Sequence, residues 1–279
     1  MTDVGLFGPR SITWRINREN VLVLGGGRAL VLQVAHPLVG AGVAQHSNYR
    51  TDPWGRLFRT LDRTTAIVFG SAEEADEAAS AVWNVHGKVE GSTDNSAGPF
   101  PAGTAYRARD PELLMWVHAT LVDTSMLVYD RYVARLSIAE RETYYEEQKA
   151  MAEAFGVPPS EQPETLAEFN DYFATMVEDK LAVTDVVRDV LDSIQNPELP
   201  FGGAMTRRLA WPLFEPVRLA TAGMLPERLR RELGLTGRPL ENRLLRAQAR
   251  LLRAALPLMP GLMREFPRAR EAKRRARVA

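Results

Sequence analysis

The residues with the most chemical potential in this chain are its four histidines, because the sequence contains no cysteine. All four lie between residues 28 and 123. His86 and His118 each fall on the apolar side of an expected helix. Neutral imidazole is a common metal ligand and a general base that works near neutral pH. Two inward-facing histidines from separate helices therefore predict a shared buried site.

A third expected helix carries Arg56, Arg59 and Thr60, which places two guanidinium groups and a hydroxyl about one turn apart. Haem requires an apolar slot, an axial donor such as neutral imidazole, and cationic or hydroxyl groups for its propionates and bound oxygen. Together with His86 and His118, these residues could supply all of these groups. The sequence favours an iron–porphyrin pocket.

Other interpretations of the histidines stay open. A histidine on the apolar face of a helix is more often a core residue with a hydrogen-bonded ring than a ligand. His36 and His46 have Pro37 between them, so they need not share a face, and His46 is expected at an exposed helix end. A non-haem metal site built from several histidines lacks a carboxylate partner, because the sequence has no Glu-x-x-His motif.

Composition narrows the classes of protein that the chain can represent. A chain of 279 residues with 45% hydrophobic and 25% charged residues is typical of a globular protein, and it is long enough for one large core. The absence of cysteine excludes disulfides, thiolate-bound metals and cysteine nucleophiles. The N-terminus lacks the pattern of a signal peptide, and no apolar run approaches about 18 residues. We therefore expect no membrane span and a cytoplasmic location.

Charge is unevenly distributed along a chain that is neutral overall. Residues 201–279 contain 18 Lys and Arg against 6 Asp and Glu, whereas residues 137–200 contain 4 against 15. This asymmetry predicts that the two segments face each other within the monomer or across a homodimer. Binding of nucleic acid is not expected, because the basic segment is poor in lysine and has no interleaved aromatic residues.

Helix signals dominate the chain. The pairs Ser71/Glu74, Ser137/Glu140 and Thr165/Glu168 have the spacing of capping boxes, and Asp110-Pro111-Glu112 is a strong helix start. Further helices are expected at 28–36, 53–69, 205–224, 226–233 and 240–256, whereas residues 91–103 read as a loop. The glycine triplet at 25–27 lacks the ending of a phosphate-binding loop and indicates a close helix contact instead.

No run of alternating residues is long enough to predict a sheet. We therefore expect an all-α fold with a single domain over residues 1–263. The arginine-rich residues 264–279 are expected to be a frayed basic tail.

Four motifs, in order, resemble one family. They are Gly-Gly-Gly-Arg-Ala-Leu-x-Leu-Gln-Val-Ala-His-Pro-x-Val from Gly25, Asp-Pro-x-x-Arg-Leu-x-Arg-Thr from Asp52, Val-His-x-x-Val-x-Gly from Val85, and Tyr-x-Ala-x-Asp-Pro-x-Leu-x-x-Trp-Val-His-Ala-Thr-Leu from Tyr106. This combination is similar to the MpaB-type oxygenases, a family that includes the latex-clearing proteins, or rubber oxygenases.

The resemblance implies a globin-like helical core that holds haem b and uses dioxygen to cleave carbon–carbon double bonds in isoprenoid chains. The axial histidine of the family corresponds to His86, and the distal segment corresponds to Arg56, Arg59 and Thr60. Arg28, in the first motif, is a further candidate for binding the cofactor. His118 would be a second group in the pocket.

Two residues depart from the family pattern. The lysine that can cap the iron in latex-clearing proteins is Arg59 here, and a guanidinium group stays protonated and cannot ligate. The sixth iron position is therefore expected to be open. Glu90 stands four residues after His86, where relatives often have arginine, and this change affects the expectation for substrate and rate more than that for haem.

The sequence thus predicts a haem b-dependent oxidoreductase, with dioxygen and an apolar, isoprenoid-like molecule as substrates. Binding and catalysis use the same residues around a haem, so a haem or lipid carrier without turnover is an alternative. A helical interaction protein whose histidines are only core residues is another. Consumption of oxygen with an isoprenoid substrate would separate the enzyme from the carrier.

Overall fold

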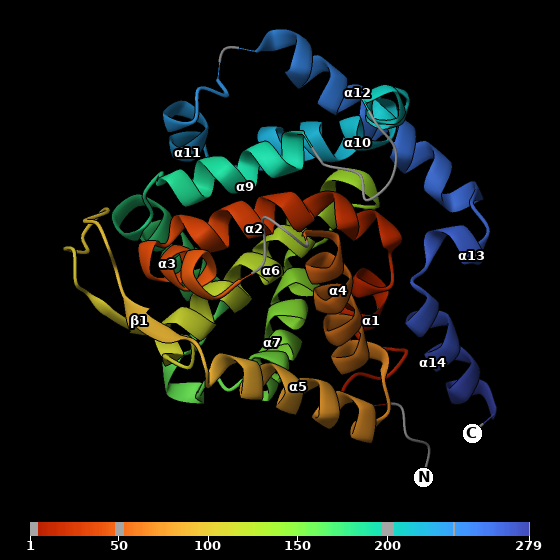
Figure 1. Ribbon diagram of the computed structural model, residues 1–279. Coiled ribbons are helices and arrows are strands. Elements are labelled where there is room, and N and C mark those ends of the chain that lie inside the picture. The colour runs from red at the N-terminus through yellow and green to blue at the C-terminus, as the bar shows by residue number, and fades with distance from the viewer. Residues whose placement is uncertain (1–4, 48–52, 197–203, 237, 279) are drawn as a thin grey trace.

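The computed structural model describes residues 5–47, 53–196, 204–236 and 238–278, with side chains described except at 53–58, 204–213 and 278. Helices make up most of it (Figure 1). In chain order the elements are α1 (Ile12–Asn17), η1 (Asn20–Gly25), α2 (Gly26–Ala35), α3 (Pro37–His46), α4 (Pro53–Phe69), α5 (Ala72–His86), β1 (Glu90–Ser92), β2 (Ala105–Arg107), α6 (Pro111–Tyr132), α7 (Ile138–Ala154), η2 (Pro159–Glu161), α8 (Leu166–Thr175), η3 (Met176–Lys180), α9 (Asp185–Gln195), α10 (Ala204–Met224), α11 (Glu227–Glu232), α12 (Pro239–Ala255), η4 (Leu256–Leu258), α13 (Gly261–Arg264) and α14 (Pro267–Val278).

The expected all-α fold is confirmed, with one small addition. Of residues 91–103, which were expected to be a loop, Gly91 and Ser92 belong to β1 and the others lie between β1 and β2. The two strands pair antiparallel, with Gly91 opposite Tyr106. The hairpin is held from outside, since the Tyr106 hydroxyl donates to Gln45 Oε1 of α3 at 2.6 Å. Three-residue strands carry too short a pattern to be recognised in a sequence.

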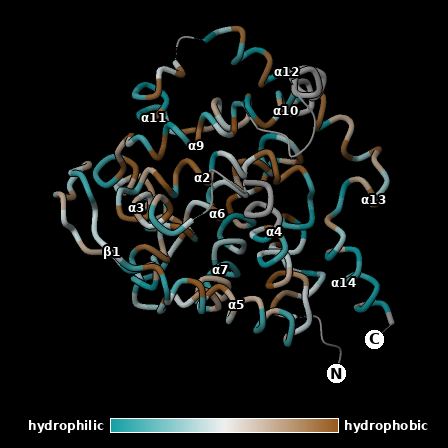
Figure 2. Tube along the Cα trace, viewed as in Figure 1, coloured by the Kyte–Doolittle hydropathy of each residue, from teal (hydrophilic) through white to brown (hydrophobic). Residues whose placement is uncertain are grey.

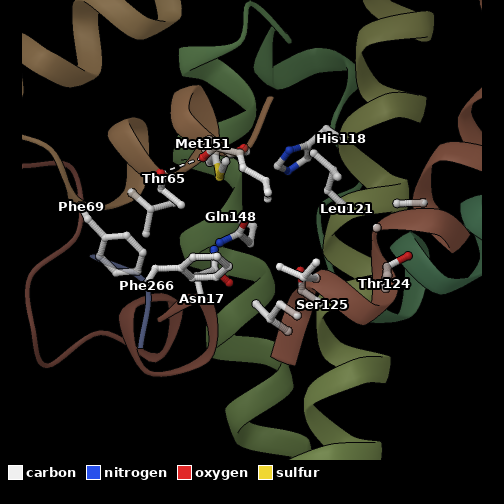
Figure 3. Close-up of a pocket in the computed structure, with 18 of the residues that line it drawn as sticks. Asn17, Thr65, Phe69, His118, Leu121, Thr124, Ser125, Gln148, Met151 and Phe266 are labelled. Carbon is white, nitrogen blue, oxygen red and sulfur yellow. Dashed lines mark hydrogen bonds between the residues drawn. The ribbon is translucent and has the colours of Figure 1, made fainter. Parts of the chain in front are cut away.

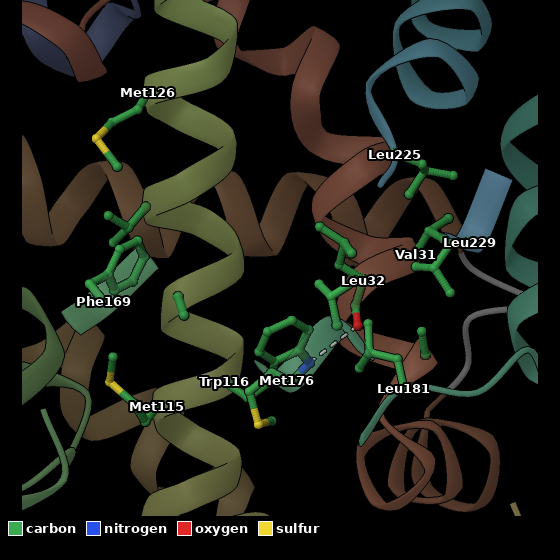
Figure 4. Close-up of a cluster of buried hydrophobic side chains, with 14 of the residues drawn as sticks. Val31, Leu32, Met115, Trp116, Met126, Phe169, Met176, Leu181, Leu225 and Leu229 are labelled. Atoms are coloured by element: carbon green, nitrogen blue, oxygen red, sulfur yellow. Dashed lines mark hydrogen bonds between the residues drawn. The ribbon is translucent and has the colours of Figure 1, made fainter. Parts of the chain in front are cut away.

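Helix α6 forms the centre of the molecule and contacts η1, α1, α2, α7 and α12 (Figure 1). Its side chains are buried on nearly every side, and Trp116 is fully buried. The Trp116 indole Nε1 donates to the carbonyl of Leu32 on α2 at 3.2 Å, which satisfies its single polar atom inside the core (Figure 4). Burial all round identifies α6 as the element against which the others pack.

The glycine triplet makes the close helix contact that the sequence predicts. A Cβ atom at Gly25 would lie 2.5 Å from Thr124 Cγ2 on α6, and one at Gly27 would lie 2.1 Å from Thr221 Oγ1 on α10. Such distances exclude any side chain, so the start of α2 lies directly against two other helices. This close approach fixes Arg28, the next residue, between α6 and α10.

Two of the three predicted capping boxes are confirmed. Ser71 with Glu74 and Ser137 with Glu140 form complete capping boxes at the starts of α5 and α7. Thr165 caps α8 through the Glu168 N–H, but the Glu168 carboxylate accepts from the Glu164 N–H instead of closing a box. The helix that Thr165 caps runs to Thr175 and is followed directly by η3.

The prediction of a frayed C-terminal tail is wrong. Residues 267–278 form α14, whose Ala269 and Ala272 are buried against the cluster that contains Trp14 and Phe69. Arg268 pairs with Asp62 of α4 at 2.9 Å. Ala269, Ala272 and a few ion pairs hold this helix in place. Its basic composition alone gives no sign of these contacts.

The predicted contact between the acidic and basic segments is present, but ion pairs do not make it: α9 packs against α10, and Arg228 of α11 donates to the carbonyls of Val177 and Leu181. Arg264 forms a bidentate pair with the fully buried Glu19, at 2.7 and 2.8 Å. Arg268 and Arg275 reach Glu74 and Asp62 of the α4–α5 region. Among the ion pairs between described residues, none joins residues 137–200 to residues 201–279. The described arginines of the basic segment that form ion pairs therefore pair with acids near the N-terminus and with acids of the segment itself, as Arg218 does with Glu215 and Glu241.

No single helix among the described residues is long and apolar enough to cross a membrane. A pair of segments bent by 102°, Asn20–Ala35 with Pro37–His46, meets the criteria of length and composition together. Helix α2 of this pair is largely buried among α6, α9 and α10, as the core helix of a folded domain is.

Candidate active site

A cavity of about 140 Å³ lies between the start of α2, the second half of α4, the middle of α6 and the face of α7 (Figure 3). Its lining consists of Asn17, Leu22, Val23, Gly25, Gly26, Ala29, Leu61, Thr64, Thr65, Val68, Phe69, His118, Leu121, Thr124, Ser125, Tyr144, Gln148, Met151 and Phe266. Most of this surface is apolar. An enclosed apolar space with a few convergent polar groups is the usual form of a small-molecule site.

Helical periodicity brings these side chains to the cavity. On α4 the lining residues Leu61, Thr64, Thr65 and Val68 follow the spacing of one helix face. On α7 the spacing of Tyr144, Gln148 and Met151 does the same. These α7 residues were not predicted from the sequence because their neighbours are mainly acidic and polar, and their spacing along one helix face is the signal that marks them.

Most polar groups of the lining are occupied by protein partners. The Thr65 hydroxyl donates to the Leu61 carbonyl at 2.7 Å. The Tyr144 hydroxyl donates to Asn17 Oδ1 at 3.0 Å, and the Gln148 amide donates to Thr13 Oγ1 at 3.0 Å. These bonds hold the polar edge of the cavity in one arrangement.

His118 is the exception among the described side chains of the lining. Its Nδ1 atom is buried and has no hydrogen-bond partner. Burial lowers the pKa of His118 to about 4, against the opposing effect of a hydrogen bond to the Gln148 backbone. The ring is therefore neutral near pH 7. If the bonded ring nitrogen carries the proton, Nδ1 presents a lone pair, and Figure 3 shows the ring beside the space between α6 and α7.

His86 lies at the C-terminal end of α5 and is not among the residues that line this cavity. It is half-buried, and its Nδ1 atom has no partner. Burial and the nearby charges of Arg109 and Arg63 lower the pKa of His86, so its imidazole is also neutral near pH 7. The Arg109 guanidinium stacks 4.3 Å from the Trp83 ring and covers this end of α5. The structure thus places the two histidines in separate surroundings.

The other two histidines stand apart from both. His36 is fully buried at the break between α2 and α3, 5.1 Å from the ring of Phe100, and neither of its ring nitrogens has a partner. Burial and then the charge of Lys180 lower the pKa of His36 to about 4. His46 is exposed at the end of α3, as expected. No group of three or more potential metal-ligating side chains occurs among the described residues, which leaves the non-haem metal site without support there.

Two of the predicted distal residues, Arg59 and Thr60, do not line the cavity. Arg59 and Thr60 have exposed side chains, and the cavity face of α4 begins one residue later, at Leu61. The side chain of Arg56 lies outside the described residues. The assignment of these three residues to the distal side of a cofactor stays a prediction.

Arg28 is buried and already has protein partners at three of its nitrogens. Its Nε donates to the Met224 carbonyl of α10 at 2.8 Å, its Nη1 donates to Thr124 Oγ1, and its Nη2 pairs with Asp123 Oδ2 at 2.6 Å. Binding a cofactor through Arg28 would require one of these contacts to break. The geometry instead makes Arg28 the link between α2, α6 and α10.

The two neutral, buried histidines make stability dependent on pH. The pKa of His36 and that of His118 are each lowered from 6.5 to about 4. Between these values the unfolded chain binds more protons than the folded chain, so the free energy of unfolding falls as the pH decreases through this window. We expect the urea midpoint of haem-free protein to fall between about pH 7 and about pH 4.5, and to fall less in His36→Leu. If the urea midpoint of His36→Leu falls with decreasing pH as steeply as that of the wild type, protonation of His36 is not a cause of the pH dependence.

Comparison with known proteins places the chain in a family. No curated protein and no solved structure matches it significantly. The profile of the family described as ER-bound oxygenase mpaB/B'/rubber oxygenase, catalytic domain, matches residues 14–254, which include all the residues that line the cavity except Phe266. The chain therefore belongs to this family of oxygenase catalytic domains.

Proposed function

We propose that the protein is a haem b-dependent oxygenase that uses dioxygen to oxidise or cleave an apolar, isoprenoid-like substrate. Two findings support this proposal. The chain belongs to an oxygenase family over most of its length. It contains a largely apolar cavity in which one buried imidazole, that of His118, keeps a ring nitrogen without a partner. The latter observation carries the proposal, since a buried polar atom without a protein partner marks a place where a bound group can supply the missing hydrogen bond.

The donor set fits haem in its chemistry. Iron in a porphyrin takes a neutral imidazole as axial ligand, and His86 and His118 both have lowered pKa values and an Nδ1 atom without a protein partner. The space is less generous, because ligand pockets commonly measure about 300–1,000 Å³ and this cavity holds about 140 Å³. Loading of a porphyrin would therefore have to enlarge the cavity past α4, which packs against α5, the helix that carries His86.

In this proposal, His86 would hold the iron, as the family motif implies, and Arg56 and Thr60 would bind the periphery of the cofactor. Haem would supply the redox chemistry with dioxygen. The rest is done by side chains of the cavity. His118 would accept a hydrogen bond at Nδ1, while Leu121 and its apolar neighbours exclude water and select an apolar substrate.

Purified protein provides the test. After expression with sufficient haem, it should show a Soret band, and the reduced protein should bind carbon monoxide without a slow phase, because Arg59 cannot cap the iron. Oxygen uptake should then depend on an added unsaturated isoprenoid. Haem binding without oxygen uptake would identify a carrier, and failure to bind haem after reconstitution would overturn the proposal. The expected cytoplasmic location and homodimer remain predictions.

A further inference from the structure

The outward face of α12 carries apolar side chains that the described chain leaves uncovered. Leu240, Leu244 and Leu251 are 66%, 44% and 70% exposed. With Ala247 they repeat every three or four residues, which places them on one side of the helix. The opposite side, with Leu245 buried, packs against α10 and α6. Helix α12 thus has a second apolar stripe that faces away from the core, and it lies at the periphery of the molecule (Figures 1 and 2).

Three arginines follow one edge of this stripe. Arg243, Arg246 and Arg250 are exposed, and no hydrogen bond or ion pair between described residues includes them. At about 100° per residue Arg243 and Arg250 project beside the leucine stripe, whereas Arg246 lies farther round the same flank of the helix. Residues 242–264 contain no acidic residue at all. The face is therefore both apolar and strongly positive.

The exposed apolar side chains continue past the end of α12. Leu258, Leu262 and Met263 are 85%, 72% and 64% exposed. The other large hydrophobic residues that are exposed in the described chain are Leu6, Trp83, Val85 and Ile138. Exposure is thus concentrated in one segment, and such concentrations mark interaction sites more often than scattered apolar residues do.

We propose that this basic apolar face, made of Leu240, Arg243, Leu244, Arg246, Ala247, Arg250 and Leu251, docks on the surface of an anionic phospholipid bilayer. A helix that lies in the membrane interface inserts its apolar stripe at the level of the acyl chains, while arginines at its edge bind lipid phosphates. The aliphatic part of each arginine adds to the apolar contact. The charge of the face matches that of the anionic lipid headgroups.

A second copy of this chain suits the face less well. Two α12 helices packed through their stripes would bring unpaired arginines of one copy close to those of the other. The acidic segment at residues 137–200 has the opposite charge, but Ile138 is the one large hydrophobic residue that it exposes among its described part. It offers no apolar surface to receive three leucines. An anionic bilayer provides both kinds of contact.

Sedimentation with lipid vesicles tests the proposal on the full-length protein. The wild type should bind vesicles that contain about 30 mol% phosphatidylserine, and binding should weaken at high salt. Each of the substitutions Arg243→Gln, Arg246→Gln and Arg250→Gln should lower the partition coefficient roughly 5-fold. The double variant Leu244→Ser/Leu251→Ser should lower it roughly 10-fold. Its thermal midpoint should not change, because both side chains are exposed.

Matched controls separate this face from general surface properties. Ile138→Ser removes another exposed apolar residue, and Arg188→Gln removes an exposed arginine of α9; neither should change vesicle binding. The proposal is overturned if the wild type ignores anionic vesicles, or if the arginine and leucine variants bind as the wild type does. It is also overturned if Leu244→Ser/Leu251→Ser dissociates a dimer in light scattering while vesicle binding stays constant, because that result assigns the face to a second copy.

Discussion

His86→Ala should purify without haem, whereas His118→Ala should retain it and lose oxygenase activity. An axial imidazole is the strongest bond between the protein and the iron, so its removal leaves only apolar packing and propionate contacts to hold the cofactor. The resemblance implies that His86 would make this bond in the proposed enzyme, and its neutral ring, with an Nδ1 atom that has no protein partner, meets the chemical requirement. His118 lines the cavity, where loss of its acceptor changes the binding of a ligand or substrate. The measurement is the ratio of Soret to protein absorbance, with oxygen uptake measured on the same samples.

The structure also specifies the result that would reverse this assignment. His118 is the histidine that faces the described cavity, so loss of the Soret band in His118→Ala, with retention in His86→Ala, would make His118 the iron ligand. His46→Ala is the matched control, because this residue is exposed at the end of α3 and should change neither haem content nor activity. A normal Soret band in both variants would contradict each assignment and direct attention to His36.

Local signals explain the parts of the fold that were predictable. The boxes at Ser71 and Ser137 involve residues three apart, so the sequence alone contains both partners of each hydrogen bond. The same holds for the spacing that buries α6. By contrast, α14 is held by contacts between Arg268 and Asp62, which are 206 residues apart. Its composition suggests a solvated tail, and only the tertiary partners show that it is docked.

The candidate site was predictable in its chemistry and less so in its geometry. His118 was correctly expected to face inward, whereas Arg59 and Thr60 are exposed where a distal pocket group was expected. The apolar residues of α4 are compatible with more than one buried face. The face that lines the cavity begins at Leu61, one residue after Thr60. Tyr144 and Gln148 were not predicted, because the acidic residues around them obscure the spacing that places them on one face of α7.

The role of Arg28 could not be predicted either, because its partners are distant in the sequence. Its replacement is the second change for which we expect a large effect. The sequence suggested a cofactor contact, but its partners on α6 and α10 lie 96 and 196 residues away. Replacing Arg28 by alanine leaves Asp123 without its cation and leaves a buried hydroxyl and a buried carbonyl without a donor. Breaking a buried pair in this way costs about 3–5 kcal/mol.

Arg28→Ala should therefore lower the thermal midpoint of the haem-free protein by roughly 10 °C. Asp123→Asn should cause a smaller loss, since Arg28 then keeps its bonds to Thr124 and Met224. Arg188→Ala, at an exposed position on α9, is the control and should change stability by less than about 0.5 kcal/mol. The haem-free form distinguishes the two roles of Arg28. If Arg28 serves mainly to bind a haem propionate, Arg28→Ala will leave the haem-free protein as stable as the wild type and weaken only the haem-loaded form. A loss that is already complete without haem shows that Arg28 holds α2 against α6 and α10, and thereby fixes one wall of the cavity that His118 faces.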